Sequence, residues 1–161
     1  MLRPSRSHEQ FQQFLEEHLN NHYFKKGLQG TVLLYHQELA KVWITDLTPV
    51  YHILAQRYSK RGSSARDPVD LFRSLLLMEL THAKSVDDWV KTMRAHPIWA
   101  IYSGFLPDDV PGVGTFYDFQ SRLWLADTPH LSSKVRKPKR KPKKGKKGEK
   151  AAITGSDTPC G

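Results

Sequence analysis

The fold is decided by the stretch Arg66-Asp67-Pro68-Val69-Asp70-Leu71-Phe72-Arg73-Ser74-Leu75-Leu76-Leu77-Met78-Glu79-Leu80. It opens with the signals of a helix start, because Asp67 can cap a helix whose first residue is Pro68. Apolar residues then surround almost the whole helix and leave one narrow polar stripe, made of Asp70, Arg73 and Ser74. Other helices must cover such a helix, and it is shorter than the roughly 20 apolar residues of a membrane span. The stretch therefore predicts a central core helix.

The segment before this helix predicts three more. Ser7 and Gln10 stand at the two positions of a capping box, and Gly27 is suited to end the first helix. The segment from Thr31 to Ile44 has strand-like ends, but the Gln-Glu-Leu-Ala-Lys run at its centre favours a single helix. Thr48-Pro49 has the pattern of a cap followed by a first-turn proline, which predicts the start of the next helix.

The segment after the core helix predicts the remaining helices. Ser85 can cap one helix, and Pro97 stops it and starts a short helix that Gly104 closes. Residues 107–114 are rich in turn formers and predict a loop. Thr115 is expected to cap the last helix, whose inward side we expect to carry Phe116, Phe119, Leu123 and Trp124.

Six or seven helices without a convincing strand predict an all-α fold, a multi-helix bundle with a helix-turn-helix-like part. Its core is expected to bury six residues together: Leu71, Phe72, Leu75, Leu76, Trp89 and Phe119. We assign residues 1–128 to this domain and residues 129–161 to a basic tail. Like charges, prolines and glycines give the tail almost nothing to bury, which predicts disorder.

The net charge of +9 lies entirely in one segment of the chain. Residues 1–133 hold equal numbers of basic and acidic residues, whereas residues 134–161 hold 11 basic and 2 acidic ones. This density predicts a polyanionic partner that the tail contacts first. Ten basic residues of the tail are therefore candidate DNA contacts: Lys134, Arg136, Lys137, Lys139, Arg140, Lys141, Lys143, Lys144, Lys146 and Lys147.

The helix predicted from Thr115 to Trp124 is a candidate recognition helix. Its outward face would offer Ser121 and Arg122 to DNA, together with the acidic Asp118. Only one of these three residues is basic, so packing explains the aromatic residues of this helix at least as well as base reading does. Both interpretations stay open at this point.

No arrangement in the sequence predicts an active site, a metal centre or a cofactor. The acid pairs Asp87-Asp88 and Asp108-Asp109 fit a helix start and a turn. His18 and His22 lie one helical turn apart, but no third ligand stands near them. Cys160 is the only cysteine, which excludes an internal disulfide and suits a reducing compartment. Because no apolar signal segment is visible at the start, we expect a cytoplasmic protein.

The order of the motifs resembles a known family. The core helix is followed by Ser85-Val86-Asp87-Asp88-Trp89 and Tyr102-Ser103-Gly104-Phe105. Residues 110–119, Val-Pro-Gly-Val-Gly-Thr-Phe-Tyr-Asp-Phe, come next and lead to Arg122-Leu123-Trp124. Over about residues 60–125 this order is similar to the N-terminal helical domain of bacterial insertion-sequence transposases of the DDE type.

The resemblance implies binding to double-stranded DNA at the terminal inverted repeats of the element. It also implies homodimerisation or pairing with a full-length transposase. Family members continue into a catalytic domain with an Asp-Asp-Glu triad, but residues 151–161 do not resemble that continuation and no acid here matches the triad. We therefore expect a truncated, non-enzymatic chain. A stand-alone regulator of transposition and an RNA-associated protein that uses only its tail are the alternatives.

Overall fold

The computed structural model describes residues 4–58 and 65–124, and within these ranges every regular element is a helix. This confirms the predicted all-α fold. No helix in these ranges is long and apolar enough to cross a membrane. In chain order the elements are α1 (His8–Leu19), the short π-helix η1 (Asn20–Phe24), α2 (Gln29–Leu34), α3 (His36–Ile44), α4 (Thr48–Ala55), α5 (Pro68–Leu80), α6 (Val86–Ala95), α7 (Pro97–Ser103) and α8 (Val113–Trp124).

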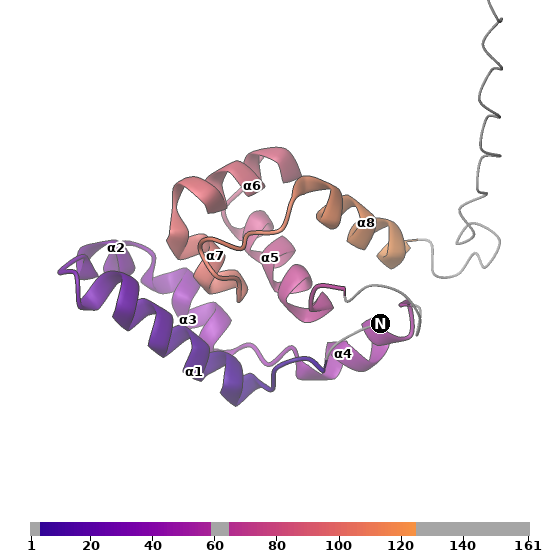
Figure 1. The fold of residues 1–161 in the computed structure, drawn as a ribbon, viewed down its shortest axis with the longest axis horizontal. Coiled ribbons are helices and arrows are strands. Elements are labelled where there is room, and N and C mark those ends of the chain that lie inside the picture. Colours follow the sequence, from indigo (N-terminus) through magenta and orange to yellow (C-terminus); the bar gives the residue numbers. More distant parts are fainter. Residues whose placement is uncertain (1–3, 59–64, 125–161) are drawn as a thin grey trace, which may run out of the picture.

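Helix α5 lies at the centre of the molecule, as its sequence predicts (Figure 1). Its start is the predicted one, because the Asp67 side chain accepts a hydrogen bond from the Val69 amide at 2.9 Å. Helices α3, α4, α7 and α8 all contact it. Helix α1 packs against α7, and α6 packs against both α7 and α8. The other helices therefore form a layer around α5.

The polar stripe of α5 faces inward, on the same side of the helix as the buried Leu71 and Leu77. Asp70, Arg73 and Ser74 are at most 5% exposed, whereas Leu76 and Leu80 are each 39% exposed. The reason is that each polar side chain has a buried partner. Asp70 accepts from Arg73 Nη1 at 2.6 Å, and Ser74 Oγ accepts from Trp89 Nε1 at 2.9 Å.

The predicted core is correct in part. Leu71, Trp89 and Phe119 are fully buried. Phe72 and Leu75 are half-buried and pack against the core from its edge. Leu76 was expected inside and is exposed, because the inward side of α5 is occupied by the polar stripe.

Helix α1 begins with the predicted capping box. The Gln10 amide donates to Ser7 Oγ at 3.2 Å, and the Ser7 amide donates to Gln10 Oε1 at 2.9 Å. The buried face of α1, made of Phe11, Leu15 and Leu19, belongs to the same core as α5 and α7. The chain then passes through η1 and turns at Gly27, whose φ of 71° is a left-handed conformation that suits glycine.

Three predicted helix boundaries are wrong. The segment from Thr31 to Ile44 is broken at Tyr35 into α2 and α3. Helix α4 is preceded by Leu47, so Thr48 is its first residue rather than its cap. Helix α8 begins at Val113, which places Thr115 inside its first turn.

Helices α6 and α7 follow the predicted signals. The Asp88 amide donates to Ser85 Oγ at 3.2 Å, and Pro97 begins α7 directly after the end of α6. Gly104 closes α7 with a φ of 97°. A Cβ atom at Gly104 would lie 2.5 Å from Asp70 Oδ1, so this position needs glycine for both its backbone conformation and its space.

Candidate nucleic-acid interface

The candidate interface is the outer surface of α8. Its inner face is anchored by Phe116 and Phe119, which are 0% and 1% exposed. Asp118, Ser121 and Arg122 all lie on the exposed side, where the sequence places them. Trp124 was expected to face inward but is 83% exposed, because α8 runs past the edge of the core.

The end of α8 is fixed by residues that directly follow α4. Arg57 Nη1 donates hydrogen bonds to the carbonyl oxygens of Arg122 at 3.1 Å and Leu123 at 2.7 Å. The Arg122 guanidinium lies 4.5 Å from the centroid of the Tyr58 ring. A cation that binds the last carbonyls of a helix also complements the negative end of the helix dipole. Two arginines that are 65 residues apart in the sequence therefore lie together at the end of α8.

This junction also sets the environment of Tyr58. Burial raises the pKa of its hydroxyl, and a hydrogen bond and the positive charge of Arg122 oppose that rise. The contact with the Tyr58 ring holds the Arg122 side chain beside the segment that follows α4. Sequence reasoning did not identify Arg57 or Tyr58, since nothing in their local pattern indicates a partner 65 residues away.

A second contact holds the beginning of α8 against α6. Tyr117 Oη donates to Asp87 Oδ2 at 3.0 Å, and this hydrogen bond raises the pKa of Tyr117. Half of the Tyr117 side chain stays exposed. Asp87, the first acid of one predicted acid pair, thus has a structural partner.

The other acid pair is engaged by the segment that leads into α5. Arg66 forms two hydrogen bonds of 2.5 Å to the two carboxylate oxygens of Asp109. This hydrogen bonding is the main cause of the lowered pKa of Asp109. The contact joins the start of the core helix to the loop before α8.

A charged cluster lies inside the domain and was not foreseen from the sequence. Asp70 is placed between Arg73 and Arg6, which both bind its carboxylate. Arg6 also donates to the carbonyl oxygen of Gly104 at 2.5 Å, and the Arg73 guanidinium lies 3.5 Å from the centroid of the Phe11 ring. Burial raises the pKa of Asp70, and the two arginines oppose the rise. The only sequence signal was an acid and a base three residues apart on an apolar helix.

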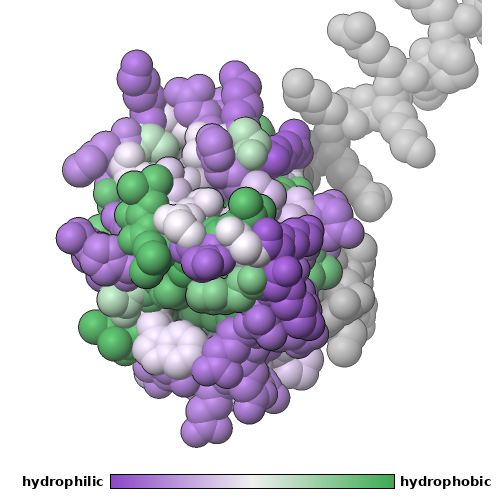
Figure 2. Space-filling model, turned by 90° about the vertical axis from the view of Figure 1, so that its left-hand side faces the viewer, coloured by the Kyte–Doolittle hydropathy of each residue, from purple (hydrophilic) through white to green (hydrophobic). Residues whose placement is uncertain are grey.

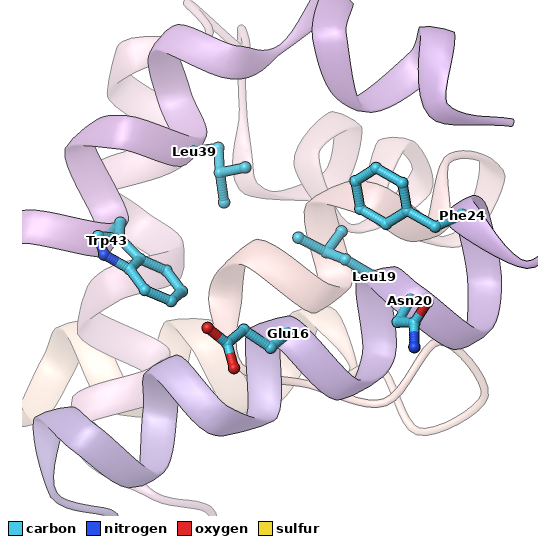
Figure 3. A pocket seen from close by; sticks show the side chains of 6 residues that line it. All are labelled: Glu16, Leu19, Asn20, Phe24, Leu39 and Trp43. Carbon is cyan, nitrogen blue, oxygen red and sulfur yellow. The ribbon is translucent and has the colours of Figure 1, made fainter.

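Two surface hollows lie away from α8. The first, of about 380 Å³, is an apolar groove between α1, η1 and α3, lined by Glu16, Leu19, Asn20, Phe24, Leu39 and Trp43 (Figure 3). Figure 2 shows hydrophobic residues gathered on the side of the molecule that carries α2. The second hollow, of about 410 Å³, is lined by Tyr35, Glu38, Thr81, Ala83, Trp89, Thr92, His96 and Trp99. Neither has the basic rim expected of a nucleic-acid site.

His18 and His22 form a stacked pair with ring centroids 6.1 Å apart. Burial lowers the pKa of His18. In the part of the chain that the structure describes, no three His, Cys, Asp or Glu side chains are grouped so that they could hold a metal ion.

The candidate tail contacts, Lys134 to Lys147, lie outside the described residues, as do the proposed tail boundary and residues 59–64 of the basic loop before α5. Their role in binding stays a prediction from the sequence. Of the candidate site residues, the structure places Ser121 and Arg122, and it adds Arg57, Tyr58 and Trp124 to their surroundings.

Comparison with family models gives one match, described as Transposase domain (DUF772), over residues 36–122. The match runs from α3 to the last turn of α8 and covers more than half of the chain. It begins earlier than the resemblance seen in the sequence motifs, because it includes α3 and α4. Searches of curated proteins and of solved structures gave no match.

Proposed function

The chain belongs to the Transposase domain (DUF772) family, and from this premise we propose that it binds double-stranded DNA at the terminal inverted repeats of an insertion-sequence element. Family membership associates the chain with transposition, and it is the observation that carries the proposal. The exposed outer face of α8 and the basic tail that follows it supply the chemistry.

In this proposal the tail provides affinity. Eleven basic residues between Lys134 and Lys150 match the charge of a phosphate backbone. Each phosphate contact releases condensed counterions, so binding of this kind is strong, insensitive to sequence and weakened by salt.

The outer face of α8 provides the preference for particular DNA ends. Ser121 and Arg122 are exposed there, and arginine is the residue most often used to contact guanine in the major groove. To contact a base, Arg122 would have to leave the Tyr58 ring, because the two groups are only 4.5 Å apart in the free protein. The helix itself would keep its place, since Arg57 binds its backbone and not its side chains.

We assign no strand-cleaving role to three acids whose partners the structure shows. Asp67 caps α5, Asp70 binds two arginines and Asp109 binds Arg66. Each carboxylate therefore has a structural partner of its own. The proposed role is binding, whether within transposition itself or as a regulator that occupies the element ends or pairs with a full-length transposase.

The test is a salt titration of binding to an element-end duplex and to a scrambled duplex. Three proteins are compared: the intact chain, a chain lacking residues 134–150, and Arg122→Ala. Removing the tail should weaken binding to both duplexes and reduce the slope of log affinity against log salt by about 0.9 for each phosphate that the shortened chain no longer neutralises. Arg122→Ala should reduce the preference for the element end and leave the slope almost unchanged.

Two results would contradict the proposal. If the tail deletion leaves slope and affinity unchanged, the tail makes no phosphate contacts. If the intact chain binds structured RNA more tightly than any duplex, the alternative of an RNA-associated protein is supported instead.

A further inference from the structure

Trp124 is the most exposed large hydrophobic residue in the described part of the chain. Its side chain is 83% exposed, whereas Trp89 and Trp99 are at most 5% exposed and Trp43 is half-buried. Tryptophan offers the largest flat surface of any side chain, and most of that surface is normally buried. An indole left open at the end of a fixed helix therefore calls for a partner.

The position of Trp124 is held by the rest of the domain. Arg57 binds the carbonyl oxygens of the two residues that precede it, so the last turn of α8 is tied to the segment after α4. The last turn of α8, which carries Trp124, is thus anchored to the rest of the domain. A platform that is already in place loses little conformational entropy when it binds.

The neighbours of Trp124 on the helix surface define one face. Residues three, four and seven positions apart share a face of an α-helix. Ser121 and Tyr117 therefore lie on the face of Trp124, with Ser121 exposed and Tyr117 48% exposed. The two aromatic residues are two turns apart, about 10 Å along the axis. Arg122 is also exposed but lies about 200° around the helix from Trp124, and its guanidinium covers the Tyr58 ring.

The charge at the end of α8 indicates the kind of partner. Arg57 and Arg122 lie at the same helix end, and the eleven basic residues of the tail begin ten positions after Trp124. Asp118 lies on the same helix and is exposed, and Asp87 of α6 accepts a hydrogen bond from Tyr117. Positive charge at this helix end favours a negatively charged partner over an apolar protein surface. Unpaired nucleobases combine a flat ring with an adjacent phosphate, and exposed aromatic residues beside cations are the usual platform for them.

We propose that Trp124 is a stacking platform for an unpaired nucleobase of single-stranded or frayed DNA, and that Tyr117 extends the same surface. This inference rests on the proposed function, which it deepens by giving the chain a second mode of contact besides duplex binding. The tail supplies phosphate contacts, and the aromatic face binds bases that have left the stack. Stacking of this kind is tolerant of sequence, because every base has a flat face.

The test uses the full chain and a fluorescein-labelled oligothymidylate of about fifteen nucleotides, a length within the site size of one single-strand-binding module, with affinity measured by fluorescence anisotropy. Trp124→Leu should weaken binding by about tenfold, within the range that stacking on one aromatic side chain usually contributes. Trp124→Phe should keep affinity close to that of the intact chain, since a ring remains. Trp43→Leu is the matched control: it removes an indole at the distant α1–α3 groove and should leave affinity unchanged.

Tryptophan emission gives an independent reading of the same event. Because Trp89 and Trp99 are buried, the quenching that unlabelled oligothymidylate produces should come mainly from Trp124. We expect this quenching to be lost in both Trp124 variants and kept in Trp43→Leu. The circular dichroism of both Trp124 variants should match that of the intact chain, since position 124 contributes little to the core.

The outcomes separate this inference from the proposed function. If the intact chain binds duplex with a steep salt dependence but Trp124→Leu binds the oligonucleotide equally well, the stacking platform is wrong and the duplex-binding proposal stands. If the chain binds neither nucleic acid, both are wrong. A blue shift of Trp124 emission that grows with protein concentration, without DNA, would show a second copy covering this face and would overturn the inference.

Discussion

Replacing Asp70 with Asn should be among the most destabilising single changes in this protein. The Asp70 carboxylate is 4% exposed and neutralises Arg73, which is 5% exposed. Asn keeps the shape of the side chain but removes the charge, so the Arg73 guanidinium would stay buried without an anionic partner. Breaking a buried ion pair in this way typically costs about 3–5 kcal/mol. Arg6 adds little to this figure, because its side chain is 31% exposed and can turn towards water.

The free energy of unfolding, measured by urea denaturation and followed by circular dichroism, gives the test. The double variant Asp70→Asn with Arg73→Met should recover most of the loss, because it removes the stranded charge and keeps an apolar group against Phe11. Arg6→Ala serves as the comparison and should cost only about 1 kcal/mol, since it leaves the Asp70–Arg73 pair intact. Two results would contradict this reasoning: a cost of less than about 1 kcal/mol for Asp70→Asn, or a double variant that is no more stable than the single one. Either would mean that the buried Asp70–Arg73 ion pair does not stabilise the folded domain.

Two further predictions concern the core helix and its contact with α7. Leu77→Ala should cost about 2–5 kcal/mol of unfolding free energy, whereas Leu76→Ala should cost less than about 1 kcal/mol, because Leu77 is 0% and Leu76 39% exposed. Equal effects in urea denaturation would show that the inward side of α5 is wrongly assigned. Gly104→Ala should lower the thermal midpoint and cost at least about 1 kcal/mol, since the new Cβ would lie 2.5 Å from Asp70 Oδ1 at a φ of 97°. An unchanged midpoint would mean that the turn can move away from Asp70.

The features predicted correctly from the sequence are those that depend on residues close together in the chain. The caps at Ser7, Asp67 and Ser85 each involve a side chain and an amide two or three residues away. The stop at Gly104 depends on the conformation of a single residue. Such signals can be read without knowing the tertiary structure, because their physical cause is local.

The orientation of α5 could not be predicted in the same way. Its polar stripe looks like a solvent-facing side unless its partners are known, and these lie far away in sequence. Arg6 is 64 residues from Asp70, and Trp89 is 15 residues from Ser74. Burying such groups is costly when they are unpaired, but the cost is removed once each group has a partner. Counting apolar residues around the helix therefore gave the right location for α5 and the burial of Leu71, but it wrongly placed Leu76 inside.

Predictions for the candidate interface were likewise correct where they depended on local sequence and wrong where they depended on distant contacts. Ser121 and Arg122 were placed on the outer face correctly, because helical periodicity fixes which residues share a side. The exposure of Trp124 was missed, since periodicity does not show where the core ends beneath a helix. Arg57 was missed because its hydrogen bonds go to backbone carbonyl oxygens, which leave no trace in the sequence of α8.

The extent of the family match can be compared with the physical unit that folds. The match begins at residue 36, yet Phe11 and Leu15 of α1 are 1% and 0% exposed in the same core. Arg6 also binds both Asp70 and the Gly104 carbonyl, which lie on two elements inside the matched region. A chain without residues 4–35 would leave the Asp70 carboxylate with one arginine and would uncover the face of α7 that α1 packs against. The cooperative unit therefore includes α1, and binding experiments on this domain need a chain that keeps this helix.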